Sequence, residues 1–191
     1  MDNEYLAIKK TIAKLAPRIE LSKLSLDDEQ NFFLLSTNSK PIHNPWTFPP
    51  INPAEFKEIF SRTLKHNFIS LAVRSKGDSK IIGIFNLSQI FYHNFQNTIL
   101  GCYANIAYHK QGYMREALLH TVGYAFFELK LHRIEANIIC ENERSKKLFT
   151  SFGFRPEGMS KNYLYINGAW RDHYKYALTR EDWDKVLSDY A

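Results

Sequence analysis

The sequence predicts one mixed α/β domain. Segments whose apolar residues lie three and four positions apart, as in helices, alternate along the chain with segments in which every second residue is apolar. The chain has 191 residues, which is the length of one domain, and 45% of them are hydrophobic and 15% aromatic. Such a chain can bury a sizeable core, which excludes a disordered protein.

The first half of the chain predicts helices around a proline-rich loop, followed by strands. Ser25 and Asp28 have the spacing of a helix capping box, and five prolines exclude regular helix and central strand from the loop. Lys76-Gly77-Asp78 forms a turn between two strands, which together read as a hairpin. In order, we expect a helix over residues 4–15, a strand over 18–24, a helix from 25 through 35, the loop over 38–53, a helix from Asn52-Pro53, and strands over 68–74 and 81–87.

The second half predicts a long helix, a short helix and a second hairpin. Gly112 opens the long helix, Gly153 ends the short one, and Asn167-Gly168 is typical of a two-residue hairpin turn. We find no internal repeat and no linker, so one domain remains the prediction. In order, we expect a strand over 99–107, a helix over 112–130, a strand over 133–140, a helix over 145–152, hairpin strands over 154–166 and 170–177, and a helix over 180–187.

Composition narrows the class of protein further. Lys and Arg number 25 against 20 Asp and Glu, a net charge of +5 that is too small to indicate nucleic-acid binding but suits an anionic ligand. The apolar runs fall far short of the ~18–20 residues that span a bilayer, and residues 1–15 lack the apolar region of a secretory signal. Cys102 and Cys140 cannot form a disulfide framework. We expect them to be inert core residues of a cytoplasmic protein.

The turn before the long helix predicts a site for a phosphate. The first N–H groups of a helix have no partner within it, and the helix dipole adds about half a positive charge there. Gly112 lets an anion approach the backbone closely, and His109, Lys110 and Arg115 surround the same turn. An ordinary helix start with a turn glycine has the same pattern, so both interpretations stay open from this segment alone.

A second run, after the next strand, favours the phosphate site. Asn142, Ser145, Phe149 and Gly153-Phe154 follow the turn in the order that is found in the GNAT superfamily of acetyl-CoA-dependent N-acetyltransferases, which the chain resembles. The resemblance implies the GNAT fold: a mixed, mostly antiparallel sheet flanked by helices, with two central strands splayed around the coenzyme. It also implies a helical extension over residues 1–16 and a single acetyltransferase domain over 17–191.

Within the superfamily, the chain is most similar to the RimJ/RimL-type enzymes, which acetylate the N-terminal residue of ribosomal proteins. The similarity runs from about Ile82 to Trp183, and Trp170 to His173 favours the RimJ type, whose acceptor is an alanine N-terminus. The residues that carry it are Gly112-Tyr113-Met114, Glu116-Ala117-Leu118, Leu131-His132-Arg133, Glu135-Ala136-Asn137, Gly153-Phe154, Glu157-Gly158, Asn167-Gly168 and Trp170-Arg171-Asp172-His173.

The resemblance implies acetyl-CoA as the co-substrate and no metal. Backbone amides of Gln111 to Arg115 would hold the pyrophosphate, and Asn142 would bond the pantetheine arm. Arg144, Lys146 and Lys147 read as a solvated helix face, or as contacts for the phosphates at the adenosine end. The implied coenzyme-binding residues are Ile106, Tyr108, Lys110, Gln111, Gly112, Tyr113, Met114, Arg115, Asn142, Ser145 and Phe149.

Three residues depart from the family's pattern. His109 stands where Gln or Arg is usual. Met114 stands where a small residue is usual and implies looser packing or a shifted phosphate. Phe149 occupies the place of the tyrosine that is often assigned as general acid. Ser145 is then the best remaining candidate to protonate the leaving thiolate.

The acceptor side is predicted less sharply. Trp46 either plugs the core or clamps the acceptor, and Arg171 and His173 either line the acceptor channel or belong to a cross-strand pair next to Trp170. Glu135 and Asn137 share one strand face, where they form an internal network or contact the acceptor. Glu135 is also the candidate residue for ordering a water molecule that acts as the base. Glu116 lies opposite the apolar stripe of its helix. It is either a solvated or salt-bridged residue or a catalytic base.

The expected reaction is direct acetyl transfer to a primary amine, with no covalent enzyme intermediate. An α-amino group, with a pKa of ~7.7–8.0, is roughly a tenth neutral at pH 7, whereas a lysine amine at ~10.4 is almost wholly charged, so an α-amine needs only a modest base. The expected partners are acetyl-CoA and a ribosomal protein N-terminus or another primary amine, without membrane or direct nucleic-acid binding; a homodimer is allowed. The alternatives are a small-molecule amine acceptor, such as a polyamine or an antibiotic, and a CoA-binding regulator or ribosome-assembly factor with vestigial activity.

Overall fold

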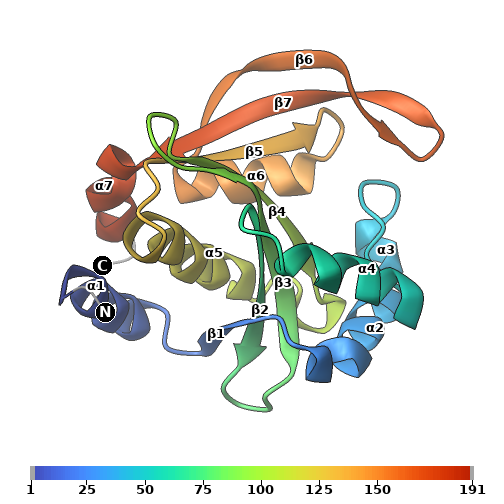
Figure 1. Ribbon diagram of the computed structural model, residues 1–191, viewed down its shortest axis with the longest axis horizontal. Helices are drawn as coiled ribbons and strands as arrows, with labels where there is room; N and C mark the ends of the chain where they lie inside the picture. Colours follow the sequence, from blue (N-terminus) through green and yellow to red (C-terminus); the bar gives the residue numbers. More distant parts are fainter. Residues whose placement is uncertain (1–2, 190–191) are drawn as a thin grey trace.

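A seven-stranded sheet forms the centre of the protein in a computed structural model, which describes residues 3–189 (Figure 1). The strand order is β1-β2-β3-β4-β5-β7-β6, and every neighbouring pair is antiparallel except β4 and β5, which are parallel. This confirms the predicted mixed, mostly antiparallel sheet. The strands are β1 (Ile19–Lys23), β2 (Phe68–Ser75), β3 (Ile81–Phe91), β4 (Asn97–Ala104), β5 (Arg133–Ile139), β6 (Arg155–Ile166) and β7 (Ala169–Thr179).

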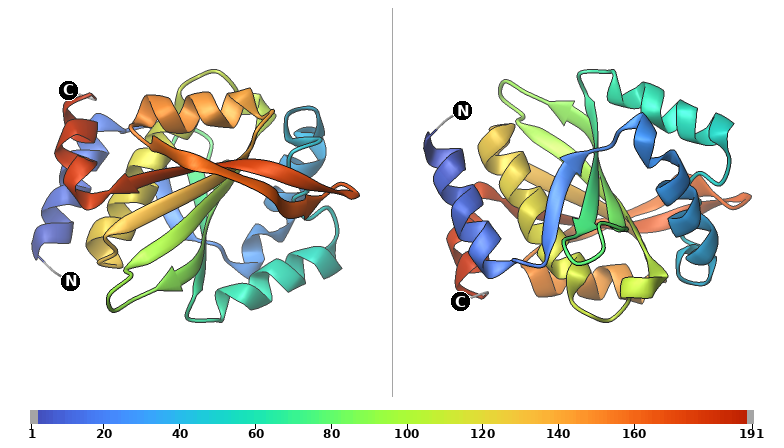
Figure 2. Two further views of the ribbon diagram at one scale, coloured as in Figure 1. Left: turned by 90° about the horizontal axis from the view of Figure 1, so that it is seen from above. Right: turned by 90° about the horizontal axis from the view of Figure 1, so that it is seen from below.

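Helices cover both faces of this sheet (Figure 2). The larger core lies under α1 (Asn3–Leu15), α5 (Tyr113–Gly123), α6 (Glu143–Phe152) and α7 (Trp183–Ser188). A smaller core of residues such as Phe32 and Phe56 lies under α2 (Glu29–Asn38) and α4 (Pro53–Thr63), which are joined through the short α3 (Lys40–His43). No helix among residues 3–189 is long and apolar enough to cross a membrane.

The two parallel strands separate halfway along their length. Their pairing covers only residues 97–99 of β4 and 133–135 of β5. Beyond these residues, β4 pairs with β3 alone and β5 with β7 alone. The predicted splay of two central strands is therefore present, and it leaves a gap in the middle of the sheet.

Local signals in the sequence set several element ends as expected. Ser25 N–H donates to Asp28 Oδ2 at 2.9 Å in the predicted capping box, and the Asn52 side chain caps α4 by accepting from Glu55 N–H at 3.0 Å. Asn167 and Gly168, with φ of 52° and 78°, both take the left-handed conformation that a tight hairpin turn requires.

Two predicted elements are different in the structure. The proline-rich stretch was expected to hold no helix, but residues 40–43 form α3, because Pro41 falls in the first turn, where no N–H is needed. The helix expected over 112–130 is α-helical only to Gly123 and continues as a π-helical segment over Tyr124–Glu128.

The N-terminal helix packs into the main core. Ile12 and Ala16 are fully buried there, and a Cβ at Gly123 of α5 would lie 2.3 Å from Ile12 Cδ1. The missing side chain of Gly123 thus lets α1 approach α5 closely. The residues predicted as an extension are consequently part of the same packed body as the rest of the chain.

Candidate active site

A cavity of about 440 Å³ lies where β4 and β5 separate. We name its two sides by the elements that form them. On the helix side it is lined by Tyr108, His109, Lys110, Gly112, Met114, Arg115, Asn142, Arg144, Ser145, Leu148 and Phe149. On the hairpin side it is lined by Ile42, His43, Trp46, Thr47, Leu164, Ile166 and His173, with Asn86, Tyr103, Asn137 and Ile139 of the strands.

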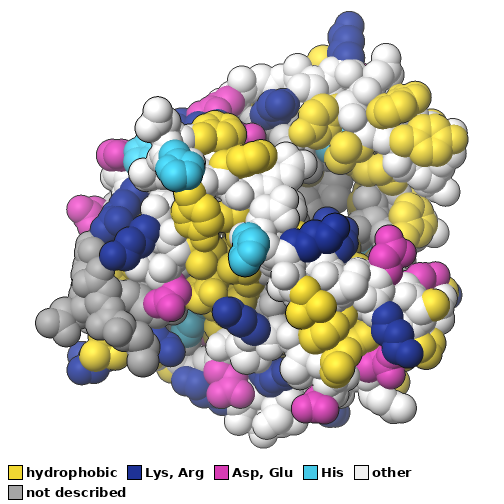
Figure 3. Space-filling model, in the orientation of Figure 1, with side chains coloured by type: hydrophobic (Ala, Val, Ile, Leu, Met, Phe, Trp, Pro, Cys, Tyr) yellow, Lys and Arg dark blue, Asp and Glu magenta, His cyan; other side chains and the backbone are white. Residues whose placement is uncertain are grey.

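The surface is hollowed beneath the free end of the β6–β7 hairpin (Figure 3). Apolar side chains gather there, and Leu164, Tyr165 and Trp170 are exposed. The rings of Tyr165 and Trp170 pack edge to face, with centroids 5.7 Å apart. The hairpin side of the cavity therefore continues into an aromatic outer surface.

The turn before α5 presents free backbone donors. Gly112 has a φ of 85°, a conformation that glycine adopts without strain. Within the described part of the chain, the N–H groups of Gly112, Tyr113 and Met114 donate to no carbonyl. These amides, with the positive end of the α5 dipole, can bind a phosphate group.

Cationic side chains surround the same side of the cavity. Lys110, Arg115 and Arg144 line it, and Arg144 also donates to the Ile42 carbonyl at 3.2 Å. Burial and the positive charges of Arg144 and Lys110 lower the pKa of His109, so this imidazole is neutral at pH 7. Lys146 does not line the cavity. Its ammonium pairs with Glu143 and lies 5.3 Å above the Tyr174 ring.

Three of the predicted coenzyme residues do not line this cavity: Ile106, Gln111 and Tyr113. The Gln111 side chain turns back and donates to the Ala107 carbonyl at 3.0 Å. Tyr113 packs edge to face on Tyr108, whose hydroxyl donates to Asp78 at 2.6 Å. The side chains of Gln111 and Tyr113 therefore stabilise the turn and do not line the cavity.

Arg18, just before β1, braces the turn, and sequence reasoning missed it. Its guanidinium donates to the Gln111 carbonyl at 3.1 Å, lies 4.1 Å from the centre of the Tyr113 ring and pairs with the Glu116 carboxylate. Glu116 is 9% exposed, so of its predicted states the salt bridge is present but solvation is not. The one signal for Arg18 was Glu116 itself, because a buried carboxylate on a helix requires a cation as its partner.

Met114 does not loosen the packing, contrary to the expectation. Its sulfur lies 3.0 Å from the position of a Cβ at Gly83, and that Cβ would also lie 2.9 Å from the Tyr103 carbonyl oxygen. Gly83 on β3 therefore makes room for the large side chain. The compensation lies 31 residues upstream (114 − 83), where no local pattern reveals it.

The residues predicted near the thioester meet at the start of α6. Ser145 lines the cavity, and its N–H donates at 3.1 Å to Asn142 Oδ1, which caps the helix. Phe149 is 3% exposed and packs edge to face on Phe154, so no hydroxyl is present at that place. Cys102 was expected in the core but is half-buried and lines the cavity; burial raises its pKa to about 12, which keeps the thiol protonated.

Amide, imidazole and aromatic groups line the hairpin side. His173 is 2% exposed, its Nδ1 lies 2.9 Å from the Arg171 carbonyl oxygen, and its ring packs against that of Tyr163. His43 Nε2 lies 2.8 Å from the Ala104 carbonyl oxygen. Asn137 donates to the Tyr163 hydroxyl at 3.3 Å. Among the described residues, 3–189, no aspartate or glutamate lines the cavity.

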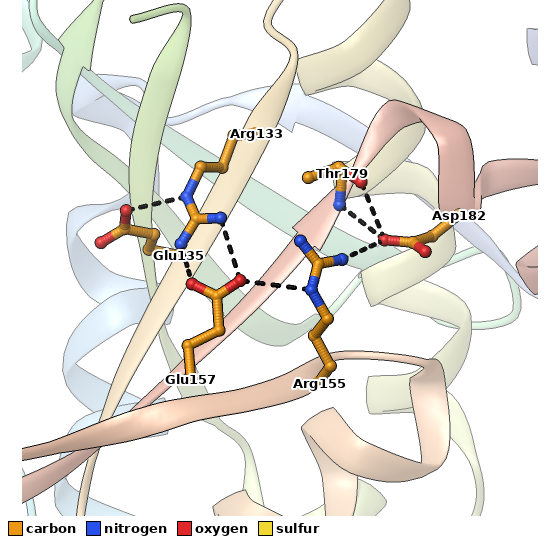
Figure 4. A network of polar contacts seen from close by, with 6 residues as sticks. All are labelled: Arg133, Glu135, Arg155, Glu157, Thr179 and Asp182. Atoms are coloured by element: carbon orange, nitrogen blue, oxygen red, sulfur yellow. Dashed lines mark hydrogen bonds and ion pairs between the residues drawn. The ribbon is translucent and has the colours of Figure 1, made fainter.

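Glu135 is not brought to the cavity, contrary to its predicted use as a base. Its carboxylate accepts from Arg133 Nε at 2.9 Å, in a network that joins β5 to β6 and to the residues after β7 (Figure 4). In that network Arg133 also pairs with Glu157, and Arg155 bridges Glu157 and Asp182 at 3.2 and 2.7 Å. For Glu135 the alternative of an internal polar network holds, whereas Asn137 lines the cavity.

Trp46 and Arg171 share a smaller hollow next to the cavity. It has a volume of about 210 Å³ and is lined by Pro45, Trp46, Ile139, Glu141 and Arg171. Trp46 and Ile139 line both spaces and thus separate them. No group of three or more potential metal ligands occurs among residues 3–189.

Residues 18–155 match the model of the acetyltransferase (GNAT) domain. The chain belongs to the GNAT family and is an acetyl-CoA-dependent N-acetyltransferase. It is 34% identical over 128 residues to the probable N-acetyltransferase YjcK of Bacillus subtilis, a match that covers 67% of this chain and 69% of that protein. It is 39% identical over 106 residues to the [ribosomal protein uS5]-alanine N-acetyltransferase of Escherichia coli, covering 56% of this chain and just over half, 55%, of that relative.

Solved structures share the fold. RimJ of Mycobacterium smegmatis in complex with CoA-disulfide superposes with a TM-score of 0.79 at 21% identity, covering 90% of this chain and 87% of that one. The ribosomal-protein-S5-alanine acetyltransferase of Vibrio fischeri gives 0.76 at 28% identity, with coverages of 87% and 95%. Spermidine N-acetyltransferase of Vibrio cholerae, in complex with CoA and spermine, gives 0.74 at 20% identity, with coverages of 87% and 98%. The fold is thus common to enzymes that are named for different acceptors.

Proposed function

We propose that the protein acetylates the α-amino group at the N-terminus of a protein, with the alanine N-terminus of a ribosomal protein as the first candidate. The observation that carries the proposal is the absence of any carboxylate among the residues that line the cavity. The similarity to the uS5-alanine acetyltransferase of Escherichia coli supports the same acceptor. We propose the cytoplasm as the compartment, since both cysteines are free thiols.

The charge of the acceptor is the physical reason. A polyamine carries several ammonium groups, and burying each of them without a carboxylate partner is costly. An N-terminal α-amine brings one titratable nitrogen, which enters a neutral site as the free base more readily than an alkyl amine does. Asn86, Asn137, His43 and His173 offer it amide and imidazole hydrogen-bonding groups on the hairpin side.

Acetyl-CoA would bind on the helix side. The free amides of Gly112 to Met114 and the side chains of Lys110, Arg115 and Arg144 fit its phosphates. Ser145 would supply a proton to the leaving sulfur, because Phe149 has no hydroxyl. Positioning of the two substrates across the gap between β4 and β5 would provide most of the rate acceleration.

The test is a competition between acceptors. The enzyme is incubated with acetyl-CoA and an equimolar mixture of a uS5-type peptide that begins with alanine, the same peptide with a blocked N-terminus, and spermidine. We expect release of CoA with a mass gain of one acetyl group on the free peptide alone. Acetylation of spermidine in preference to the peptide would overturn the proposal. CoA binding without turnover on any amine would favour the alternative of a CoA-binding regulator with vestigial activity.

A further inference from the structure

We propose that His173 is the general base that takes the proton from the acceptor amine. The proposal rests on acetyl transfer to an amine at the cavity described above. It assigns a catalytic role to a residue that the sequence placed only in the acceptor channel.

The orientation of the imidazole is the first argument. Nδ1 lies 2.9 Å from the Arg171 carbonyl oxygen, which can only accept, so Nδ1 carries the proton. Nε2 is then the nitrogen with the free lone pair. The ring is 2% exposed to the outside and lines the cavity on its hairpin side. A backbone carbonyl that fixes the tautomer of a histidine is the usual way in which proteins prepare one ring nitrogen as a base.

The surroundings leave the lone pair without a competing anion. Tyr163 of β6 packs against the ring with centroids 5.5 Å apart, and Lys175 of β7 lies 5.0 Å above the Tyr163 ring. Arg171 shares the strand face of His173, while the paired strand β5 presents Asn137 and Ile139, which do not titrate. The charged and titratable groups next to the ring on this face are therefore a phenol and two cations. Glu135 lies further along the same face of β5, where Arg133 holds its carboxylate.

The other candidates for the base are less suited. Glu135 is held by Arg133 and does not line the cavity. His43 lines it, but its second nitrogen, Nδ1, is buried without a partner and closed to solvent. His109 lies on the helix side, next to Lys110 and Arg144. His43 shares the fixed tautomer and the acceptor side, but only the second nitrogen of His173 is not among the buried, unpartnered atoms of residues 3–189.

The chemical step balances as follows. The lone pair of the neutral amine forms the N–C bond to the acetyl carbon, and one N–H proton passes to Nε2 of His173. The C–S bond breaks with its electron pair on sulfur, and the thiolate takes a proton from the Ser145 hydroxyl, which regains one from water. His173 then returns its proton to water. The products are an N-acetyl amide and free CoA.

The variant His173→Asn tests the assignment, because the amide NH₂ of asparagine can keep the hydrogen bond to the Arg171 carbonyl while Nε2 is lost. We expect kcat/KM for the amine to fall about 100-fold or more at pH 7. The KM for acetyl-CoA should stay unchanged, and the pH profile of kcat/KM should lose the ionisation of the enzyme base and keep that of the acceptor amine. His120→Gln is the matched control, since His120 Nε2 also lies on a backbone carbonyl, that of Ala16 at 3.1 Å, but outside the cavity.

A pH profile of kcat/KM in which His173→Asn keeps every ionisation of the wild type, or activity within threefold of the wild type, would overturn the assignment. A second measurement needs no variant. ¹⁵N NMR of the wild-type protein should show the Nδ1–H tautomer for His173 at pH 7.5, and an Nε2–H tautomer would overturn the assignment as well. If the wild-type enzyme acetylates no amine, the proposed function fails; if it is active and the variant is its equal, only the base assignment fails.

Discussion

The two sides of the cavity differ in both chemistry and construction. The helix side comes from one stretch of chain, residues 108–149, and offers backbone amides and cations. The hairpin side is assembled from residues that are far apart, in the loop after α3, in three strands and in the β6–β7 hairpin, and it offers neutral and aromatic groups. A ligand with fixed phosphates can be gripped by one local motif, whereas the choice of acceptor depends on side chains that only the tertiary fold brings together.

The largest expected effect in a test of this contrast comes from two ion pairs whose carboxylates are buried, one in each region. Arg18 pairs with Glu116 behind the helix side, and Arg74 pairs with Asp28 in the smaller core. Replacing either arginine with methionine leaves a buried carboxylate alone, and we expect each change to lower the free energy of unfolding by about 2–4 kcal/mol, measured by urea denaturation. Only Arg18→Met should also raise the KM for acetyl-CoA, by about tenfold or 1.4 kcal/mol, because only Arg18 holds the turn at Gln111.

The double variant Arg18→Met/Glu116→Met separates stability from binding. Removal of the uncompensated carboxylate should restore most of the lost stability. The KM should remain high, since the Gln111 carbonyl still lacks its donor. An equal rise in KM for Arg74→Met would show that the effect is only a consequence of lower stability.

Local motifs are the features of the fold that the sequence alone could predict. The capping box of Ser25 and Asp28, the turn glycine at 112 and the Asn167-Gly168 hairpin are local signals, and each was predicted correctly. The family's motifs on the helix side are also carried by neighbouring residues, and the splay of the two central strands was implied by the family resemblance.

The sequence alone could not predict contacts between residues that are far apart in the chain. Arg18 and Glu116 are 98 positions apart, and a single chain gives no reason to connect them. Gly83 and Met114 compensate in volume across two elements. Glu135 was misread because its partners, Arg133 and, through it, Glu157, meet only when β6 folds back beside β7. Most of the hairpin side of the cavity is likewise formed by tertiary packing, so the sequence alone could not predict it.

The hairpin side can be tested by adding the charge that it lacks. Asn137→Asp places a carboxylate in the neutral part of the cavity, where it would pair with a second ammonium group. We expect kcat/KM for spermidine, relative to that for the alanine peptide, to rise about tenfold in CoA-release assays. Asn94→Asp, on the exposed β3–β4 connection, is the control and should leave the ratio unchanged. An unaltered ratio in Asn137→Asp would mean that charge in the cavity does not select the acceptor.

Two lysines test the helix side with a smaller effect. Lys110 lines the cavity, whereas Lys146 is turned toward Glu143 and Tyr174. Lys110→Ala should raise the KM for acetyl-CoA about threefold at low salt, with less effect at 1 M salt, where exposed charges are screened. Lys146→Ala should leave this KM at the wild-type value. Equal effects of the two changes would show that the phosphates respond to net charge rather than to the site.

The smallest expected effect concerns the stability of each region in acid. Burial lowers the pKa of His43, on the hairpin side, and of His120, on α5. Between their lowered pKa values and the ordinary value near ~6.5, the unfolded chain binds protons that the folded protein does not, so stability falls as the pH falls through this window. Each histidine contributes at most about 1.4 kcal/mol per pH unit.

Glutamine can keep the contacts that both histidines make through Nε2. His43→Gln and His120→Gln should therefore each flatten the slope of unfolding free energy against pH below ~6.5, and their effects should add because the residues lie in different regions. A slope that neither variant changes would place the acid sensitivity in the carboxylates, such as Glu157, whose pKa the neighbouring Arg133 lowers. In that case the acid response would arise from the β5–β6 network and would be common to both regions.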